Sequence, residues 1–119
     1  MTSRNFGKYL EQYPENIRKI ALALRVGILK IIPTAEEKVH IGMKWVAYGA
    51  PRAIFAIKPE QNHVKLFFFE GAKLSDPDHV LRGSGSRLRF IPVTNTEKEG
   101  KIIEGLMEQA YFLHKKEKN

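Results

Sequence analysis

The chain has 119 residues, a formal net charge of +7 and no cysteine. Its length fits one compact domain, which we expect to span residues 1–119, and its 43% of hydrophobic residues suffices for one core. The lack of cysteine excludes disulfides, zinc–thiolate sites, iron–sulfur clusters and thiol nucleophiles.

The basic charge and the absence of long apolar runs bear on location and partners. No apolar segment near the N-terminus resembles a signal peptide, and apolar runs such as residues 20–24 and 66–69 are far shorter than the roughly 20 residues that span a bilayer. We therefore expect a cytoplasmic protein without a membrane partner. Basic residues are spread from Arg4 to Lys118 and no nucleic-acid-binding motif accompanies them, so we do not expect a nucleic-acid partner.

The first third of the chain predicts helices. Ser3 is placed to cap a short helix, and Pro14 to open a second one, where its missing N–H is tolerated. Apolar residues then recur at helical spacing over residues 17–31. Pro33 ends this helix, because a residue before proline is pushed out of the helical region.

The middle of the chain changes to an alternation of period two, which is typical of strands. The segment TAEEK at 34–38, with its capping-box spacing, first predicts one more helical turn. We then expect strands at 39–48, with a bulge at Gly42, at 52–58, at 63–69 and at 86–93. The segment GAP at 49–51 reads as a turn. In the last strand, Leu88 and Phe90 are expected to point inward and Arg87 and Arg89 outward.

Thr96 and Glu99 form a second capping box, and a final helix is expected to run to about His114. Strands joined by short turns must be antiparallel, because a parallel return needs a long crossover. The sequence therefore predicts an α+β fold, in which an antiparallel sheet of about four to five strands carries the N-terminal and C-terminal helices.

The segment LRGSGSRLRF at 81–90 is the strongest candidate for a binding site. Successive turn amides can hold an anion, and the ligand-binding candidates there are Arg82, Ser84, Arg87 and Arg89. The segment lacks the features of a P-loop or a dinucleotide fingerprint, and it leads into a strand rather than a helix. We favour the interpretation as a glycine turn, while the anion site stays open as the alternative.

Aromatic residues suggest a second candidate site. Trp45, Phe67 and Phe69, together with Tyr48 and Phe55, could line an apolar pocket between sheet and helices. Core packing is the simpler interpretation, since small domains place most of their aromatic residues in the core. If Phe67 and Phe69 are exposed, a homodimer is a third interpretation.

Metal binding and catalysis have weaker signals. The metal-ligand candidates are Asp76, Asp78 and His79 in one loop, and the set Glu36, Glu37 and His40. Asp76 and Asp78 flank a proline and also read as turn residues, so we assign no metal. None of the four histidines stands in a catalytic motif, so we expect neither an enzyme nor a cofactor.

Two long segments carry a family resemblance. The segments YPENIRKIALALRVGILKIIPTAEEKVHIGM (13–43) and KPEQNHVKLFFFEGAKLSDPDHVLRGSGSRLRFIPV (58–93) resemble the YdhG-like family of small bacterial proteins of mostly unknown function, over roughly residues 8–112. The resemblance implies an α+β fold with an antiparallel sheet. It also implies, through one relative described as a frataxin-like iron chaperone, an intracellular iron carrier as an alternative function.

From the residues themselves we expect a binding or accessory protein that holds a small ligand or anion near the turn at 83–89. Exchanging Arg87 and Arg89 would remove such a ligand, whereas an iron carrier would respond to changes at Asp76 and Asp78.

Overall fold

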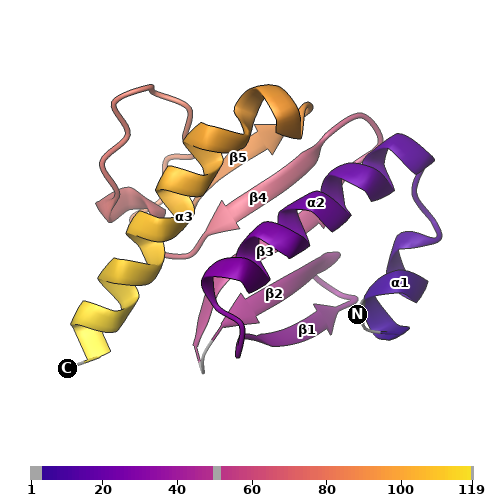
Figure 1. Ribbon diagram of the computed structural model, residues 1–119, viewed down its shortest axis with the longest axis horizontal. Coiled ribbons are helices and arrows are strands. Elements are labelled where there is room, and N and C mark those ends of the chain that lie inside the picture. Colours follow the sequence, from indigo (N-terminus) through magenta and orange to yellow (C-terminus); the bar gives the residue numbers. More distant parts are fainter. Residues whose placement is uncertain (1–3, 50–51, 119) are drawn as a thin grey trace.

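In the computed structural model, which describes residues 4–49 and 52–118, helices cover one face of an antiparallel sheet (Figure 1). Within these residues the sheet has five strands in chain order, each hydrogen-bonded to the next. The strands are β1 Glu36–His40, β2 Trp45–Gly49, β3 Ala53–Pro59, β4 Val64–Phe68 and β5 Arg89–Val93. This confirms the predicted α+β fold.

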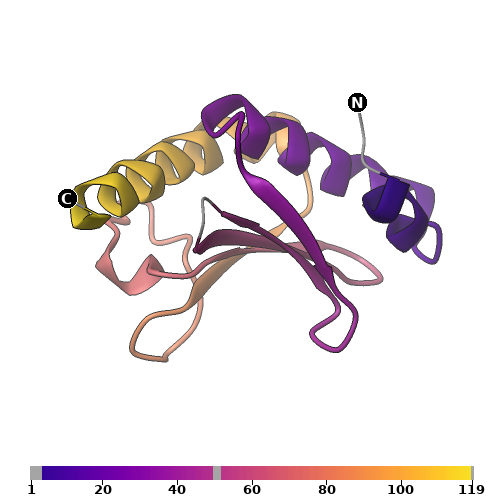
Figure 2. The same cartoon turned by 90° about the horizontal axis from the view of Figure 1, so that it is seen from below.

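The helices lie together on the same side of the sheet (Figure 2). They are α1 Arg4–Leu10, α2 Glu15–Ile31 and α3 Thr96–Lys118, and a 3-10 turn, η1 Gly71–Lys73, follows β4. None of the helices in the described ranges is long and apolar enough to cross a membrane. The predicted cap Ser3 and the predicted turn at residues 50–51 lie outside the described residues.

The prolines and the helical spacing place α2 as predicted. Pro14 is its N-cap residue, and the helix ends at Ile31, two residues before Pro33. Its buried stripe includes Ile17, Leu24 and Ile28, which face the sheet core.

Strand β1 differs from the elements predicted for this part of the chain. Residues 36–40 form a strand instead of a helical turn, and a turn at 41–44 splits the strand that was expected over 39–48. The Lys44 N–H donates to Ile41 O at 3.1 Å, and Lys44 has φ 57°. Ile41 and Met43 continue the apolar alternation but are 80% and 50% exposed, because they stand on the turn.

The register of β5 also differs from the prediction of which residues face the core. Ile91 pairs with Leu66 and Val93 with Val64, so Ile91 and Val93 join the buried core under the helices. Phe90 pairs with Phe67 and therefore lies on the sheet face away from the helices, not inward as predicted. We call the helix-covered side the inner face and the opposite side the outer face.

The inner face and the helices share one core. Phe55 and Phe68 are fully buried there and meet edge to face with ring centroids 5.6 Å apart. The other buried sheet residues of this core include Val46, Tyr48, Ile57, Val64 and Leu66.

Helix α3 has a different cap from the one predicted. Asn95 is the capping residue, because its Oδ1 accepts from the N–H groups of Glu97 and Lys98 at 3.0 and 3.1 Å. Glu99 Oε1 reaches back to the Thr94 and Asn95 N–H groups, as a capping box requires. The helix continues to Lys118, past the expected end at His114.

Candidate functional site

A cavity of about 210 Å³ lies where the C-terminal half of α3 passes over the ends of β3 and β4. Its apolar lining comes from Ala53, Ile54, Phe69, Ala110 and Leu113. Its polar lining comes from Arg52, Glu70, Arg87, His114 and Glu117. The site thus combines an apolar wall, on which a small ligand can pack, with charged groups that can orient it.

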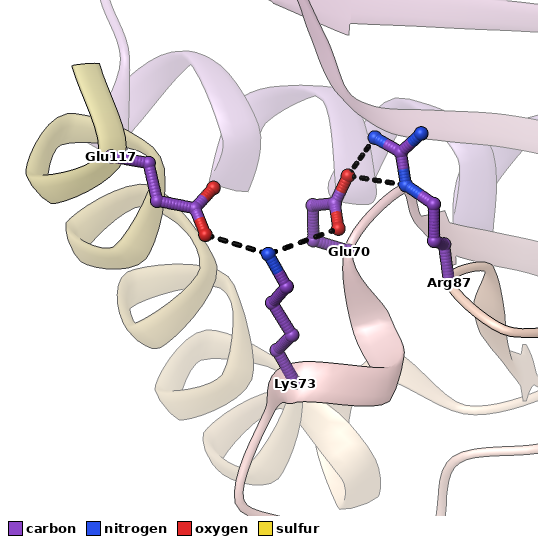
Figure 3. Close-up of polar contacts among 4 residues, drawn as sticks. All are labelled: Glu70, Lys73, Arg87 and Glu117. Atoms are coloured by element: carbon purple, nitrogen blue, oxygen red, sulfur yellow. Dashed lines mark hydrogen bonds and ion pairs between the residues drawn. The ribbon is translucent and has the colours of Figure 1, made fainter.

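A chain of ion pairs forms one side of this cavity (Figure 3). Arg87 Nε donates to Glu70 Oε2 at 2.8 Å, and its Nη2 contacts the same oxygen. Lys73 Nζ lies 3.7 Å from Glu70 Oε1 and 2.7 Å from Glu117 Oε2. The four residues come from the segment after β4, from η1, from the loop before β5 and from the end of α3. These ion pairs therefore connect the four segments.

The hydrogen bond from Arg87 holds the pKa of the Glu70 carboxyl below its ordinary value. Partial desolvation acts in the opposite direction, and the positive charges of Arg87 and Lys73 lower the pKa further. Glu117 in turn raises the pKa of Lys73, chiefly through its hydrogen bond. The Glu70 carboxylate therefore stays ionised at neutral pH and is compensated by the cations beside it.

Two guanidinium groups at this cavity keep donors without a protein partner. Arg52 is exposed and makes no ion pair with any residue that the structure describes. Arg87 uses Nε and Nη2 for Glu70, which leaves its Nη1 without a partner in the described part of the chain (Figure 3). Arginine donors of this kind match carboxylate and phosphate oxygens.

His114 adds a buried imidazole to the cavity. It is 8% exposed and continues the stripe of α3 that carries Ala110 toward the sheet. Ile102, near the start of the same helix, is 38% exposed.

The glycine turn of LRGSGSRLRF is a turn in the structure. Gly83 has φ 121°, which is a conformation that favours glycine, and a Cβ there would lie 3.2 Å from Leu88 O. Arg89 Nη1 donates to Gly85 O and Leu88 O at 2.6 and 2.8 Å, so it braces the loop itself. Ser84 is exposed on the same loop.

The predicted arginines separate in space. Arg82 pairs with Phe90 through two main-chain hydrogen bonds, so it lies beyond β5 at the edge of the sheet. Arg89 pairs with Phe68 on the inner side, and Arg87 alone of the set lines the cavity at α3. The cavity thus joins one residue from each predicted site: Arg87 from the glycine turn and Phe69 from the aromatic set.

The aromatic set also divides between the two faces. Tyr48 and Phe55 are in the core under the helices, whereas Trp45 and its neighbours Phe67 and Phe69 cluster on the outer face. Trp45 and Phe67 therefore lie on the other side of the sheet from the predicted pocket, whereas Phe69 also lines the cavity at α3. Strand alternation puts odd and even residues on opposite sides of the sheet, and the turn at 41–44 sets which side Trp45 takes.

The metal-ligand candidates have other partners. Both carboxylate oxygens of Asp76 accept main-chain N–H groups, from Val80 and Leu81, at 3.0 Å. Glu37 is bound to Arg25 and Tyr48 in the interior. Within the described ranges, no three histidine, aspartate or glutamate side chains come together in a way that could hold a metal ion.

Sequence reasoning missed Arg52, Glu70, His114 and Glu117. They are far apart in the chain and belong to no motif, so only their packing around the end of α3 makes them neighbours. A comparison of the chain with protein families, with curated proteins and with solved structures finds no match in any of the three.

Proposed function

We propose that this chain is a small binding protein whose cavity at α3 holds a small organic anion with an apolar body. The observation that carries the proposal is the pair of arginines at the cavity, Arg52 and Arg87, with donors that no described residue uses. A carboxylate or phosphate group would meet these donors while its apolar body packs on Ile54, Phe69 and Leu113.

The size and charge of the cavity narrow the ligand. Drug-sized ligands occupy pockets of roughly 300–1,000 Å³, and this cavity of about 210 Å³ suits a smaller molecule. Lys73 and Arg87 compensate Glu70 and Glu117, so the charge of Arg52 remains uncompensated among the described residues. This balance favours a singly charged anion.

The proposal keeps the sequence-based expectation of binding without catalysis but moves the ligand from the glycine turn to the cavity beside it. Membership of the YdhG-like family and a cytoplasmic location remain parts of this proposal. The iron carrier that the resemblance implies stays an alternative, and no cluster of metal ligands among the described residues favours it.

A thermal-shift panel tests the proposal. It contains butyrate, hexanoate, benzoate and phenyl phosphate, the neutral amides hexanamide and benzamide as matched controls, and Fe²⁺ for the alternative. A ligand at a hundred times its Kd adds about 2.7 kcal/mol to the unfolding free energy, which is about 11 °C for a domain of this size. We expect a shift with at least one anion and none with its amide.

Two arginine variants locate the site. Arg52→Gln should abolish the shift, since it removes a cation that makes no ion pair with the described residues and thus leaves the fold intact. Arg82→Gln, an equal charge change outside the cavity, should leave the shift in place. A shift that survives Arg52→Gln and is lost in Arg82→Gln would return the ligand to the glycine turn, and a shift with Fe²⁺ alone would support the iron carrier.

A further inference from the structure

The outer face of the sheet carries an aromatic cluster that the cavity does not explain. Trp45 meets Phe67 and Phe69 edge to face, with ring centroids 5.2 and 5.4 Å apart, and Phe67 lies 5.2 Å from Phe90. Among the described elements, the helices lie on the opposite side of the sheet (Figure 2). Phe67 and Phe90 are accordingly only half-buried.

Strand register arranges this face in a row. Successive cross-strand partners, from β1 to the segment beyond β5, are Lys38, Ala47, Ala56, Phe67, Phe90 and Arg82. Directly paired residues share a sheet face, with Cβ atoms roughly 5 Å apart. The row therefore has small side chains and two aromatic rings in its middle and a cation at each end.

A second set of cations lies beside the row. Lys58 and Lys65 are direct cross-strand partners on the same face, and Lys65 Nζ lies 5.1 Å from the centroid of the Phe90 ring. Two carboxylates lie beside these lysines: Glu36, 3.4 Å from Lys38, and Glu60, 3.7 Å from Lys65. Neither carboxylate forms an ion pair with Lys58 or Arg82 in the described structure, so these two cations remain available to a phosphate.

Two loops flank the face. The β1–β2 turn at 41–44 and the loop at 82–88 both project from the sheet on the side away from the helices (Figure 2). Both hold exposed residues, among them Ile41 and Lys44 on one side and Ser84 on the other. An extended ligand lying across the strands would run between them.

We propose that this outer face binds single-stranded nucleic acid. Aromatic rings on a sheet accept the faces of unpaired bases, and nearby lysine and arginine side chains bind the phosphates. A duplex keeps its base faces stacked and cannot use the rings. A second copy of this chain fits less well, because it would bring its own Lys58 and Lys65 toward these cations. The scatter of basic residues along the sequence had argued against nucleic acid, but the fold gathers four of them around one aromatic cluster.

Fluorescence anisotropy of a labelled twelve-residue oligothymidylate tests the proposal at 50 mM salt, with a duplex of equal length and polyglutamate as competitors. We expect the single strand to bind more tightly than either competitor. Trp45 is the only tryptophan of the chain and touches Phe67, so its emission should fall over the same concentration range. Binding without a change in Trp45 emission would overturn the proposal, as would preference for the duplex or for polyglutamate.

Charge variants provide the decisive comparison. Lys58→Gln with Lys65→Gln should weaken binding at least fivefold and reduce the slope of log affinity against log salt by about 1.4, since each single-strand phosphate contact contributes about 0.7. The control pair Lys19→Gln with Lys101→Gln makes the same charge change on α2 and α3 and should alter affinity less than twofold. Equal losses in both pairs would show nonspecific attraction and refute the site.

An aromatic variant separates stacking from charge. Phe67→Leu with Phe90→Leu keeps apolar bulk on the sheet and should weaken binding about tenfold, since stacking contributes strongly for each base. Circular dichroism checks its fold, and the lysine pair tests the proposal if this variant unfolds. Arg52→Gln should leave oligonucleotide binding unchanged, so failure at this face is distinguishable from failure of the cavity. Dimerisation that buries Trp45 in the absence of oligonucleotide would also contradict the proposal.

Discussion

Replacing Glu37 by glutamine tests how the sheet edge is joined to α2. Arg25 Nε donates to Glu37 Oε2 at 2.5 Å, Tyr48 Oη donates to the same oxygen at 2.6 Å, and the Arg25 and Glu37 side chains are each 10% exposed. Glutamine has the same shape and still accepts one hydrogen bond, but it removes the negative charge that faces the Arg25 cation in the interior.

The magnitude follows from this burial. Removing one partner of a buried ion pair typically lowers the unfolding free energy by about 3–5 kcal/mol. The retained acceptor places Glu37→Gln near the lower end, at about 3 kcal/mol. With an unfolding entropy of about 2.1 cal/mol/K per residue, the whole chain has about 0.25 kcal/mol/K, so Tm should fall by about 12 °C.

Urea unfolding followed by circular dichroism measures this loss, with calorimetry for Tm. The matched control is Glu36→Gln on the same strand, where the pair with Lys38 is exposed and a change under about 0.5 kcal/mol is expected. The double variant Arg25→Met with Glu37→Gln also removes the buried cation and should be about 1–2 kcal/mol more stable than Glu37→Gln alone. Strictly additive losses, or a loss no larger than that of Glu36→Gln, would refute the reasoning.

Three further predictions concern pH, the glycine turn and a helix cap. Burial, followed by the hydrogen bond to Glu37, raises the pKa of Tyr48 above its ordinary value. The folded state thus keeps this proton when the unfolded chain loses it, and stability falls as pH rises above about 10. Tyr48→Phe should flatten that fall in unfolding free energies measured from pH 9 to 11, and an unchanged slope would contradict the assignment. Gly83→Ala should lower stability by about 1–3 kcal/mol because of its positive φ, whereas Gly85→Ala, with nothing within 4 Å of a Cβ, should be nearly neutral in the same urea titration. Asn95→Ala should lower Tm by about 4 °C, since a lost N-cap typically removes about 1 kcal/mol, and calorimetry showing no change would refute this capping role.

Local sequence signals predicted much of the fold. Pro14 and Pro33 bound α2 because each restricts its own neighbourhood, and period-two alternation identified the strands 52–58 and 63–69 within a residue or two. Not every local signal was correct. The capping-box spacing at 34–37 was overridden by pairing of β1 with β2, which satisfies the backbone of 36–40 and buries Glu37 against Arg25 and Tyr48.

The candidate sites depended more on tertiary structure than the fold did. The sequence identified Arg87 and Phe69 separately, but their meeting at one cavity with Arg52, His114 and Glu117 follows from how α3 crosses the sheet. No spacing rule joins residues 52, 87 and 114, because the contacts between them form only when distant segments pack.

The sequence by itself determined the α+β class, the antiparallel connection of the strands and the glycine turn at 83, because each depends on short-range periodicity or backbone sterics. The tertiary structure alone decided the strand register, and with it which face each aromatic residue occupies. A shift of one residue reverses the faces of a strand. That register places Phe67, Phe90, Lys58 and Lys65 on one sheet face that no described helix covers. The order of residues along the chain predicts only scattered basic residues and aromatic residues in the core.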